Sequence, residues 1–119
     1  MAHILIIEDS ENDRLIAKRF LTDAGYQELV FSETGEDGVA KAGSEVPDLV
    51  ITDTILPGID GFEVCQKIRE ALGDTVKIII MTGSVDAVDA VKARRMGADD
   101  YVVKSGDPAL LLEAVKRLI

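Results

Sequence analysis

The chain has 119 residues, the size of one domain, and 47% of them are hydrophobic, which is enough for one core. Its formal net charge of −9 argues against a domain that grips nucleic acid by itself, because phosphate contacts need clustered Lys and Arg. The apolar runs are too short to span a membrane, and the first residues do not form a secretory signal. We therefore expect one domain over residues 1–119 in a cytoplasmic protein.

The single cysteine and the single histidine disfavour several kinds of site. One cysteine can form neither an intrachain disulfide nor a cysteine-based metal site. Cys65 shares a helical face with Phe62 and Ile68, which predicts a core residue. His3 lies at the beginning of the first apolar run, away from the polar residues that end the runs. Catalytic triads and zinc sites are therefore not expected.

Short apolar runs alternate with helical patterns along the whole chain. Strands are predicted over residues 4–7, 28–31, 49–52, 77–81 and 101–103. Helices are predicted over residues 10–24, 35–42, 61–72 and 85–96, and from 107 to the end. Ser10 is suited to cap the first helix, and glycines stop the first, third and fourth helices. The Pro57-Gly58 pair predicts a turn between the third strand and the helix after it.

The first predicted helix carries a mostly apolar stripe, and the last one is rich in apolar residues. The stripe of the first helix is formed by Asp13, Ala17, Phe20, Leu21 and Ala24. The last helix begins with Asp107 as a cap, followed by Pro108, and it has more apolar residues than one buried stripe requires. We therefore expect either Leu110 or Leu112 to lie outside the core.

The pattern predicts an α/β fold of the flavodoxin-like, doubly wound kind. Runs such as Ile-Leu-Ile-Ile and Ile-Ile-Ile-Met are apolar throughout, which indicates burial on both faces of a parallel sheet. Strict alternation of strands and helices with short links requires right-handed crossovers. Five strands with five flanking helices suit the order 2-1-3-4-5, in which ligands bind at the carboxyl ends of the strands.

Polar residues end four of the five apolar runs. Glu8 and Asp9 follow the first run, Asp53 the third, Thr82 the fourth and Lys104 the fifth. Because the carboxyl ends of parallel strands share one edge of the sheet, we expect these side chains to converge. Individually each has an ordinary structural interpretation: the acids and Thr82 as helix caps, and Lys104 as a solvated side chain.

Convergence would create a site for a metal ion and a phosphoryl group. Three carboxylates within a few ångströms repel one another, so they need a compensating cation. Carboxylate oxygens, with the backbone carbonyl of Ile55, favour Mg²⁺. A hydroxyl and an ammonium orient and neutralise phosphoryl oxygens, and Asp53 could attack phosphorus to form an acyl phosphate.

Four segments at family spacing make the chain resemble the response-regulator receiver domain of two-component signalling, of the chemotaxis-regulator kind. These segments are Glu8-Asp9, Asp53-Thr-Ile-Leu-Pro57-Gly-Ile-Asp60-Gly61, Met81-Thr82-Gly83-Ser84 and Gly97-Ala-Asp-Asp-Tyr101-Val-Val-Lys104. The resemblance implies that Asp53 accepts phosphate from the phosphohistidine of a sensor kinase or phosphotransfer protein. It further implies that Glu8 and Asp9 hold Mg²⁺ with Asp53, and that Lys104 pairs with the phosphoryl oxygens.

The resemblance also implies a switch. Thr82 would move toward the phosphate and Tyr101 would follow it inward, while Pro57 and Gly61 would shape the loop after the acceptor. Ile55 and Ser84 would occupy positions that tune the lifetime of the phosphorylated state. The output face would be the fourth helix, fifth strand and fifth helix, acting on a downstream effector domain or protein. A dimer linked to phosphorylation is a further possibility that this resemblance leaves open.

One residue departs from the family pattern. The family usually has a proline after this lysine, in a cis peptide, whereas this chain reads Lys104-Ser105-Gly106. A cis bond before a residue other than proline costs about 3 kcal/mol, so we predict a trans peptide at 104–105. Without this proline, the direction of the Lys104 side chain is an open question.

Other functions on the same fold stay open as alternatives. The first is an interaction module that works without phosphorylation. A flavodoxin would need a phosphate loop after the first strand and aromatic residues around the flavin, and a haloacid-dehalogenase-type phosphatase would need Asp-x-Asp there. Under the favoured interpretation the chain is not an enzyme, since it would catalyse only its own phosphorylation and dephosphorylation. It would serve either as a stand-alone regulator or as part of a longer protein.

Overall fold

The computed structural model describes residues 2–83 and 87–119. The chain alternates strands and helices in the following order: β1 (His3–Ile7), α1 (Glu11–Asp23), β2 (Glu28–Ser32), α2 (Gly35–Glu45), β3 (Leu49–Asp53), α3 (Gly61–Leu72), the short 3-10 helix η1 (Gly73–Thr75), β4 (Lys77–Thr82), α4 (Ala87–Arg95), β5 (Asp100–Val103) and α5 (Ala109–Leu118). The five strands form one parallel sheet in the order β2-β1-β3-β4-β5, as predicted.

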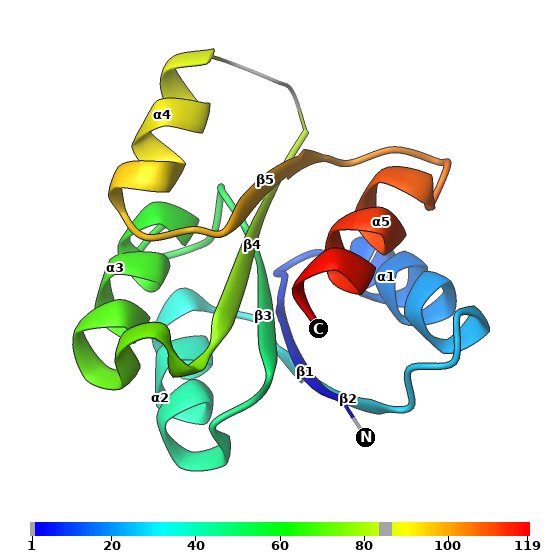
Figure 1. Cartoon of the computed structure of the whole chain (residues 1–119), viewed down its shortest axis with the longest axis horizontal. Helices are drawn as coiled ribbons and strands as arrows, with labels where there is room; N and C mark the ends of the chain where they lie inside the picture. Colours follow the sequence, from blue (N-terminus) through cyan, green and yellow to red (C-terminus); the bar gives the residue numbers. More distant parts are fainter. Residues whose placement is uncertain (1, 84–86) are drawn as a thin grey trace.

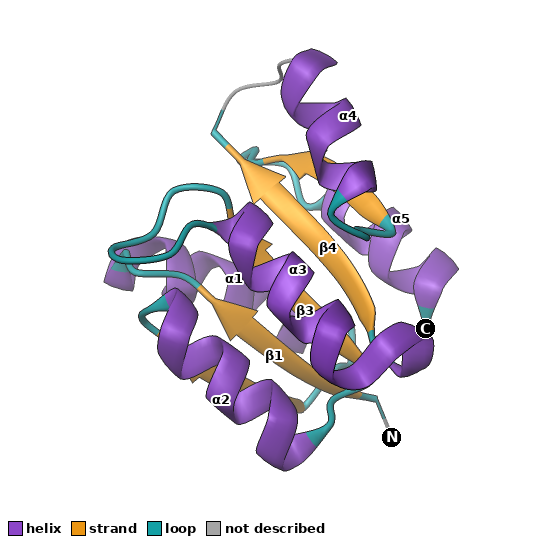
Figure 2. Cartoon of the chain, turned by 90° about the vertical axis from the view of Figure 1, so that its left-hand side faces the viewer, coloured by secondary structure: helices purple, strands orange, loops and turns teal. Residues whose placement is uncertain are grey.

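Helices cover both faces of the sheet, which explains why the strands are apolar throughout (Figures 1 and 2). α1 and α5 lie on one face, and α2, α3 and α4 lie on the other. Successive residues of a strand point to opposite faces, so Ile4 and Ile6 pack with Leu111 of α5, whereas Leu5 and Ile7 pack with Ile68 of α3. Within the described ranges, every helix is too short or too polar to cross a membrane.

Most predicted element boundaries are confirmed to within one or two residues. α3 begins at Gly61 and ends at Leu72, as predicted, and Ser10 caps α1 by accepting a hydrogen bond from the backbone N–H of Asp13. α2 is longer than predicted because it continues past Ala42 to Glu45, where Val46 ends it in a left-handed conformation. The predicted start of the fourth helix at Val85 lies outside the described residues.

The predicted stripe of α1 needs one correction, whereas the prediction for α5 is confirmed. Leu21 is fully buried on α1 and Ala17 and Phe20 are half-buried, but Ala24 is exposed because α1 ends before it. On α5, Leu110 is exposed and Leu112 packs partly against the core. Cys65 is fully buried, as predicted for a core residue.

Candidate functional site

The carboxyl ends of β1, β3, β4 and β5 carry the polar residues that the sequence pattern singled out. β3 pairs with both β1 and β4, so Asp53 is placed close to the residues that follow β1. Oxygen atoms of Glu8, Asp9 and Asp53 all lie within 4.8 Å of one another. The predicted convergence of the three carboxylates is therefore confirmed.

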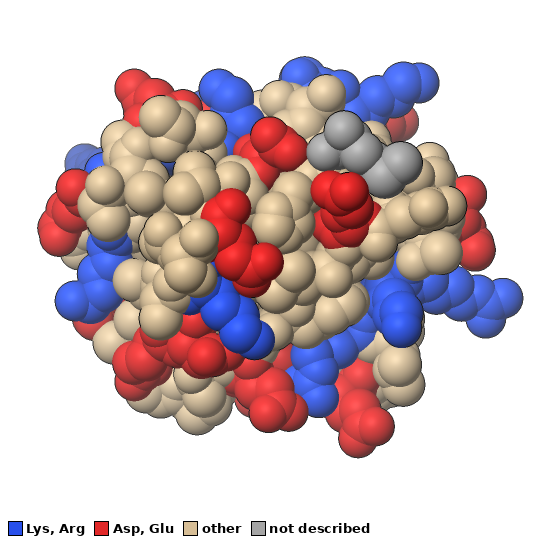
Figure 3. Space-filling model, turned by 90° about the horizontal axis from the view of Figure 1, so that it is seen from below, with Lys and Arg blue, Asp and Glu red and all other residues tan. Residues whose placement is uncertain are grey.

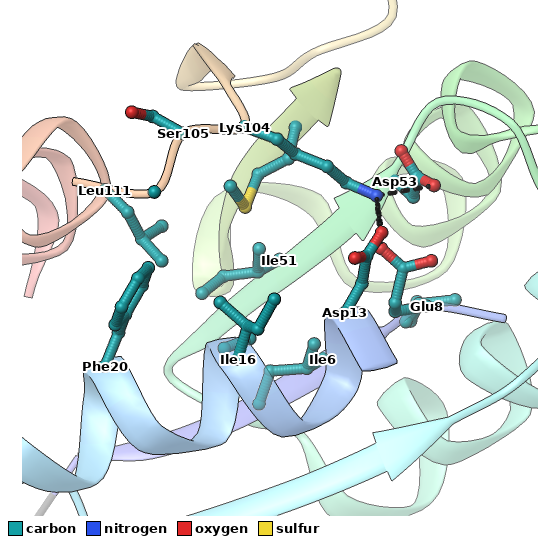
Figure 4. Close-up of a pocket in the computed structure, with 14 residues that line it drawn as sticks. Ile6, Glu8, Asp13, Ile16, Phe20, Ile51, Asp53, Lys104, Ser105 and Leu111 are labelled. Carbon is teal, nitrogen blue, oxygen red and sulfur yellow. Dashed lines mark hydrogen bonds and ion pairs between the residues drawn. The ribbon is translucent and has the colours of Figure 1, made fainter. Parts of the chain in front are cut away.

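Lys104 reaches into this cluster from the end of β5, as Figure 4 shows. Its Nζ atom donates to Glu8 Oε1 at 2.5 Å, to Asp13 Oδ2 at 2.8 Å and to Asp53 Oδ2 at 3.1 Å. The side chain of Lys104 is about a quarter exposed, whereas those of Glu8 and Asp53 are almost enclosed. The lysine is thus an internal partner of the acids rather than a solvated side chain.

Burial and charge shift the pKa values of two groups in the cluster. Burial raises the pKa of Glu8 to about 7, although the hydrogen bonds from Lys104 and from the backbone of Ser10 act in the opposite direction. Burial alone would lower the pKa of Lys104, but its hydrogen bonds to Asp13 and Glu8 and the charge of Asp53 outweigh that effect and raise it. Lys104 therefore stays an ammonium at neutral pH.

The loop after β3 is held close to the site by a glycine. The backbone N–H of Gly61 donates to the carbonyl oxygen of Thr54 at 2.9 Å, which folds residues 54–60 into a tight loop. A Cβ atom at Gly61 would collide with the carbonyl oxygen of Asp53, so only glycine fits this close approach. Ile55 projects from this loop and is 80% exposed. The predicted shaping role of Gly61 thus has a steric basis.

Thr82 and Tyr101 lie at the predicted places on β4 and β5. Thr82 is the last residue of β4, is buried, and its carbonyl oxygen accepts the backbone N–H of Lys104 at 2.7 Å. Tyr101 packs partly against the core on the α3 side, and its buried hydroxyl has no hydrogen-bond partner among the described residues. Ser84 lies outside the described residues. All peptide bonds in the described ranges are trans, including 104–105, as predicted.

Two site residues on α1 were not identified as such from the sequence. Asp13 was predicted only as part of the mostly apolar stripe of the first helix. A carboxylate in that stripe, in the helical turn next to Glu8 and Asp9, was the signal that could have identified it as a site residue. Arg14 donates from Nη1 to the carbonyl oxygens of Glu8 and Asp9 at 2.9 and 3.0 Å, and from Nη2 to Glu33. A cation in the first turn of a helix is electrostatically unfavourable, which was a signal that Arg14 has a specific partner.

An apolar cavity extends from the carboxylates toward the gap between α1 and α5. It has a volume of about 270 Å³ and continues past Ile16, Phe20 and Leu111 below Lys104 (Figure 4). Ser105 and Gly106, which are both exposed, line it beside Lys104. The charged cluster is therefore reachable from solvent.

Comparison with known proteins agrees with this geometry. The family model of the response regulator receiver domain matches residues 4–116. The transcriptional regulatory protein AfsQ1 of Streptomyces coelicolor is 42% identical over 104 residues, which are 87% of this chain and 45% of that protein. The response regulator ArlR of Staphylococcus aureus is 40% identical over 119 residues, which are 100% of this chain and 53% of that protein. The chain thus spans about half the length of these relatives.

Solved structures show the same fold over nearly the whole chain. The chemotaxis protein CheY4 of Vibrio cholerae superposes with a TM-score of 0.91 at 28% identity, covering 100% of this chain and 99% of that one. A CheY-like receiver domain protein from Methanospirillum hungatei gives a TM-score of 0.89 at 31% identity, covering 98% and 92% of the two chains. Together with the match over residues 4–116, these similarities show that the chain belongs to the response regulator receiver domain family of two-component systems.

Proposed function

We propose that this receiver domain accepts a phosphoryl group on Asp53 from the phosphohistidine of a sensor kinase or phosphotransfer protein. The observation that carries the proposal is the placement of Lys104 Nζ at 3.1 Å from Asp53 Oδ2 within a surplus of carboxylates. An oxygen of Asp53 attacks phosphorus, the bond from phosphorus to the imidazole nitrogen breaks, and the imidazole leaves as the phosphoryl group becomes an acyl phosphate.

The residues present fit a magnesium ion. The oxygens of Glu8, Asp9 and Asp53 form a compact set of hard ligands, and the backbone carbonyl of Ile55 is proposed to complete it. One positive charge, on Lys104, faces four carboxylates, namely those three and Asp13. When bound, Mg²⁺ would neutralise the negative charge of the acids and of the incoming phosphoryl group.

Thr82 and Lys104 would orient the phosphoryl group, and Tyr101 would respond to phosphorylation. Thr82, buried at the end of β4, would donate its hydroxyl to the phosphoryl group, and Lys104 would contact a phosphoryl oxygen. A phosphoryl group adds roughly 1.5 to 2 negative charges, and it can bias two states only through contacts that differ between them. Tyr101 belongs to β5, the strand that runs between α4 and α5 at the edge of the sheet (Figure 1). We propose that it transmits the change to that output face.

Intact mass spectrometry after incubation with acetyl phosphate tests the proposal. The native chain should gain one phosphoryl adduct in the presence of Mg²⁺ and none in its absence. Asp53→Asn should lose the adduct, whereas Asp74→Asn, an exposed aspartate beyond the other end of α3, should retain it. A native chain that forms no adduct and binds no beryllofluoride would support the phosphorylation-independent interaction module.

A further inference from the structure

The ammonium of Lys104 uses all three of its N–H donors. An ammonium has three donors and no acceptor, and here the three acceptors are Glu8, Asp13 and Asp53. Glu8 follows β1 and Asp53 is the last residue of β3, but Asp13 belongs to the first turn of α1. The position of the ammonium is therefore defined jointly by the sheet and by a helix.

The chain around Lys104 fixes its backbone but not its side chain. The backbone N–H is held by the carbonyl oxygen of Thr82 at 2.7 Å. Ser105 and Gly106, which follow, are exposed, and a Cβ atom at Gly106 would have no neighbour within 4 Å. A lysine side chain is flexible and loses rotamer freedom when it is held, so its direction must come from its acceptors.

Asp13 is the acceptor best suited to hold Lys104 without joining the metal ligands. The group of carboxylates close enough to share a cation consists of Glu8, Asp9 and Asp53, and Asp13 is not in it. Asp13 is fixed by the helix cap, because its backbone N–H donates to Ser10 Oγ at 3.3 Å. The next residue, Arg14, ties the same helical turn to the backbone of Glu8 and Asp9.

We propose that Asp13 is a positioning residue that holds the Lys104 ammonium beside Asp53 for phosphoryl transfer. This inference rests on the proposed function, because it assigns Lys104 a task in that reaction. When phosphorus approaches Asp53, one donor of Lys104 stays on Asp13 and the others are available to the phosphoryl oxygens. Asp13 itself does not touch the reacting atoms.

The rate of phosphorylation by acetyl phosphate at saturating Mg²⁺ gives the first test. Loss of a positioning contact should slow Asp13→Ala by about tenfold, because small misplacements of a reacting group are costly. Asp13→Asn, which keeps an acceptor oxygen but loses the charge, should fall between Asp13→Ala and the native chain. Asp23→Asn changes an exposed aspartate on the same helix and should leave the rate unchanged. A native rate in Asp13→Ala would overturn the inference.

The same substitution in a Lys104→Met chain distinguishes the positioning of Lys104 from a general structural effect of Asp13. In Lys104→Met there is no ammonium to hold, so adding Asp13→Ala should slow the reaction no further. An equal fold-reduction in both backgrounds would show that Asp13 acts through the structure of α1 and would contradict the proposal.

The ¹⁵N signal of the Lys104 ammonium gives a readout that needs no phosphorylation. Its protons should exchange slowly with water in the native chain and in Asp23→Asn, and rapidly in Asp13→Ala. Rapid exchange in the native chain would overturn the role of Asp13. Slow exchange that depends on Asp13, in a chain that forms no adduct, would support the placement by Asp13 and count against the proposed function alone.

Discussion

Arg69 and Lys104 are partly buried cations at opposite ends of the sheet, and the sets of oxygen atoms around them differ in charge. At the end where the strands begin, Arg69 of α3 donates to the carbonyl oxygens of Gly73, Val76 and Gly97 and to the carboxylate of Asp99. At the other end, Lys104 donates only to carboxylates. The Arg69 cluster holds one charge of each sign, whereas the Lys104 cluster has a surplus of negative charge.

This difference separates the structural role of the Arg69 cluster from the chemical role proposed for the Lys104 cluster. Asp99 also accepts the backbone N–H of Ile78, so the Arg69 cluster joins α3, β4 and the α4–β5 connection with its charges paired. Acidic and basic side chains are likewise interspersed over the surface on the N-terminal side (Figure 3). The surplus of carboxylates at the Lys104 end favours a second cation and a group that carries charge. A cluster with paired charges stabilises the fold, whereas a cluster with surplus negative charge can bind a further cation.

Arg69→Met should have the largest effect on stability. The substitution leaves Asp99 without its cation and three carbonyl oxygens without their side-chain donor, so the free energy of unfolding should fall by about 3 kcal/mol. Urea denaturation followed by circular dichroism measures this change. Lys67→Met, which removes an exposed cation from the same helix, should change it by less than about 0.5 kcal/mol. Equal effects of the two substitutions would contradict the role given to Arg69.

Gly97→Ala should have the next largest effect, and Gly25→Ala is its matched control. Both glycines follow a helix with φ of 100°, and each donates its N–H to a carbonyl oxygen three residues earlier at 3.0 Å. A Cβ atom at Gly97 would lie 2.7 Å from Cγ of Arg69, whereas one at Gly25 would have no neighbour within 4 Å. Backbone strain should cost about 1 kcal/mol at either position. The contact with Arg69 should cost about 1 kcal/mol more at Gly97.

Chemical denaturation of both glycine variants checks this difference. If Gly25→Ala is destabilised as much as Gly97→Ala, the packing around Arg69 adapts and only the backbone strain matters. The Arg69→Ala background offers a further check, because it removes the Cγ atom and the extra cost at Gly97 should then disappear.

The sequence predicted the secondary structure and the order of the strands better than the contacts between residues far apart in the chain. Apolar runs, helix caps and glycine stops are patterns of a few neighbouring residues. They were enough to predict the strand order, the helices on both faces of the sheet and the limits of α3. Gly97 was predicted only as a helix stop, and the role of Arg69 was not predicted. The contacts of Arg69 join residues as far apart as 69 and 99, and no local pattern indicates such a partner.

The candidate site shows the same limit. Glu8, Asp9, Asp53, Thr82 and Lys104 could be placed together because each ends a strand, and strand ends share one edge of the sheet. Asp13 could be assigned to the inward face of its helix, but its ion pair with Lys104 joins residues 91 positions apart. The absence of proline after Lys104 left the direction of its side chain open, and the structure shows the ammonium held on three carboxylates.

Asp9→Asn should change stability in the opposite direction from Arg69→Met. Asp9 is exposed and its carboxylate lies among those of Glu8 and Asp53, so neutralising it relieves repulsion. In metal-free buffer the free energy of unfolding should rise by up to about 1 kcal/mol. In the native chain Mg²⁺ should raise the melting temperature, because an ion that binds only the folded state stabilises it. That increase should be lost in Asp9→Asn.

Thermal denaturation with EDTA and with increasing Mg²⁺ measures both effects of Asp9→Asn. Asp48→Asn is not a suitable control, because Asp48 accepts the backbone N–H of His3. Asp74→Asn changes an exposed aspartate and should leave the magnesium response intact. If Asp9→Asn destabilises the metal-free chain, the carboxylates at this end are already balanced, and the comparison with the Arg69 cluster fails.

Tyr101→Phe should have the smallest effect on stability. The Tyr101 hydroxyl is buried without a partner among the described residues, so its removal sacrifices no hydrogen bond and should change the free energy of unfolding by less than about 0.5 kcal/mol. The side chains around Arg69 are satisfied, whereas this hydroxyl, on the strand that leads from Asp99 to Lys104, is not. A group that is unsatisfied in one state can gain a partner in another, and such a difference is what a switch requires. A loss of more than about 1 kcal/mol in urea denaturation would show that the hydroxyl already has a partner, such as an ordered water. The contrast between the two ends of the sheet would then be confined to charge.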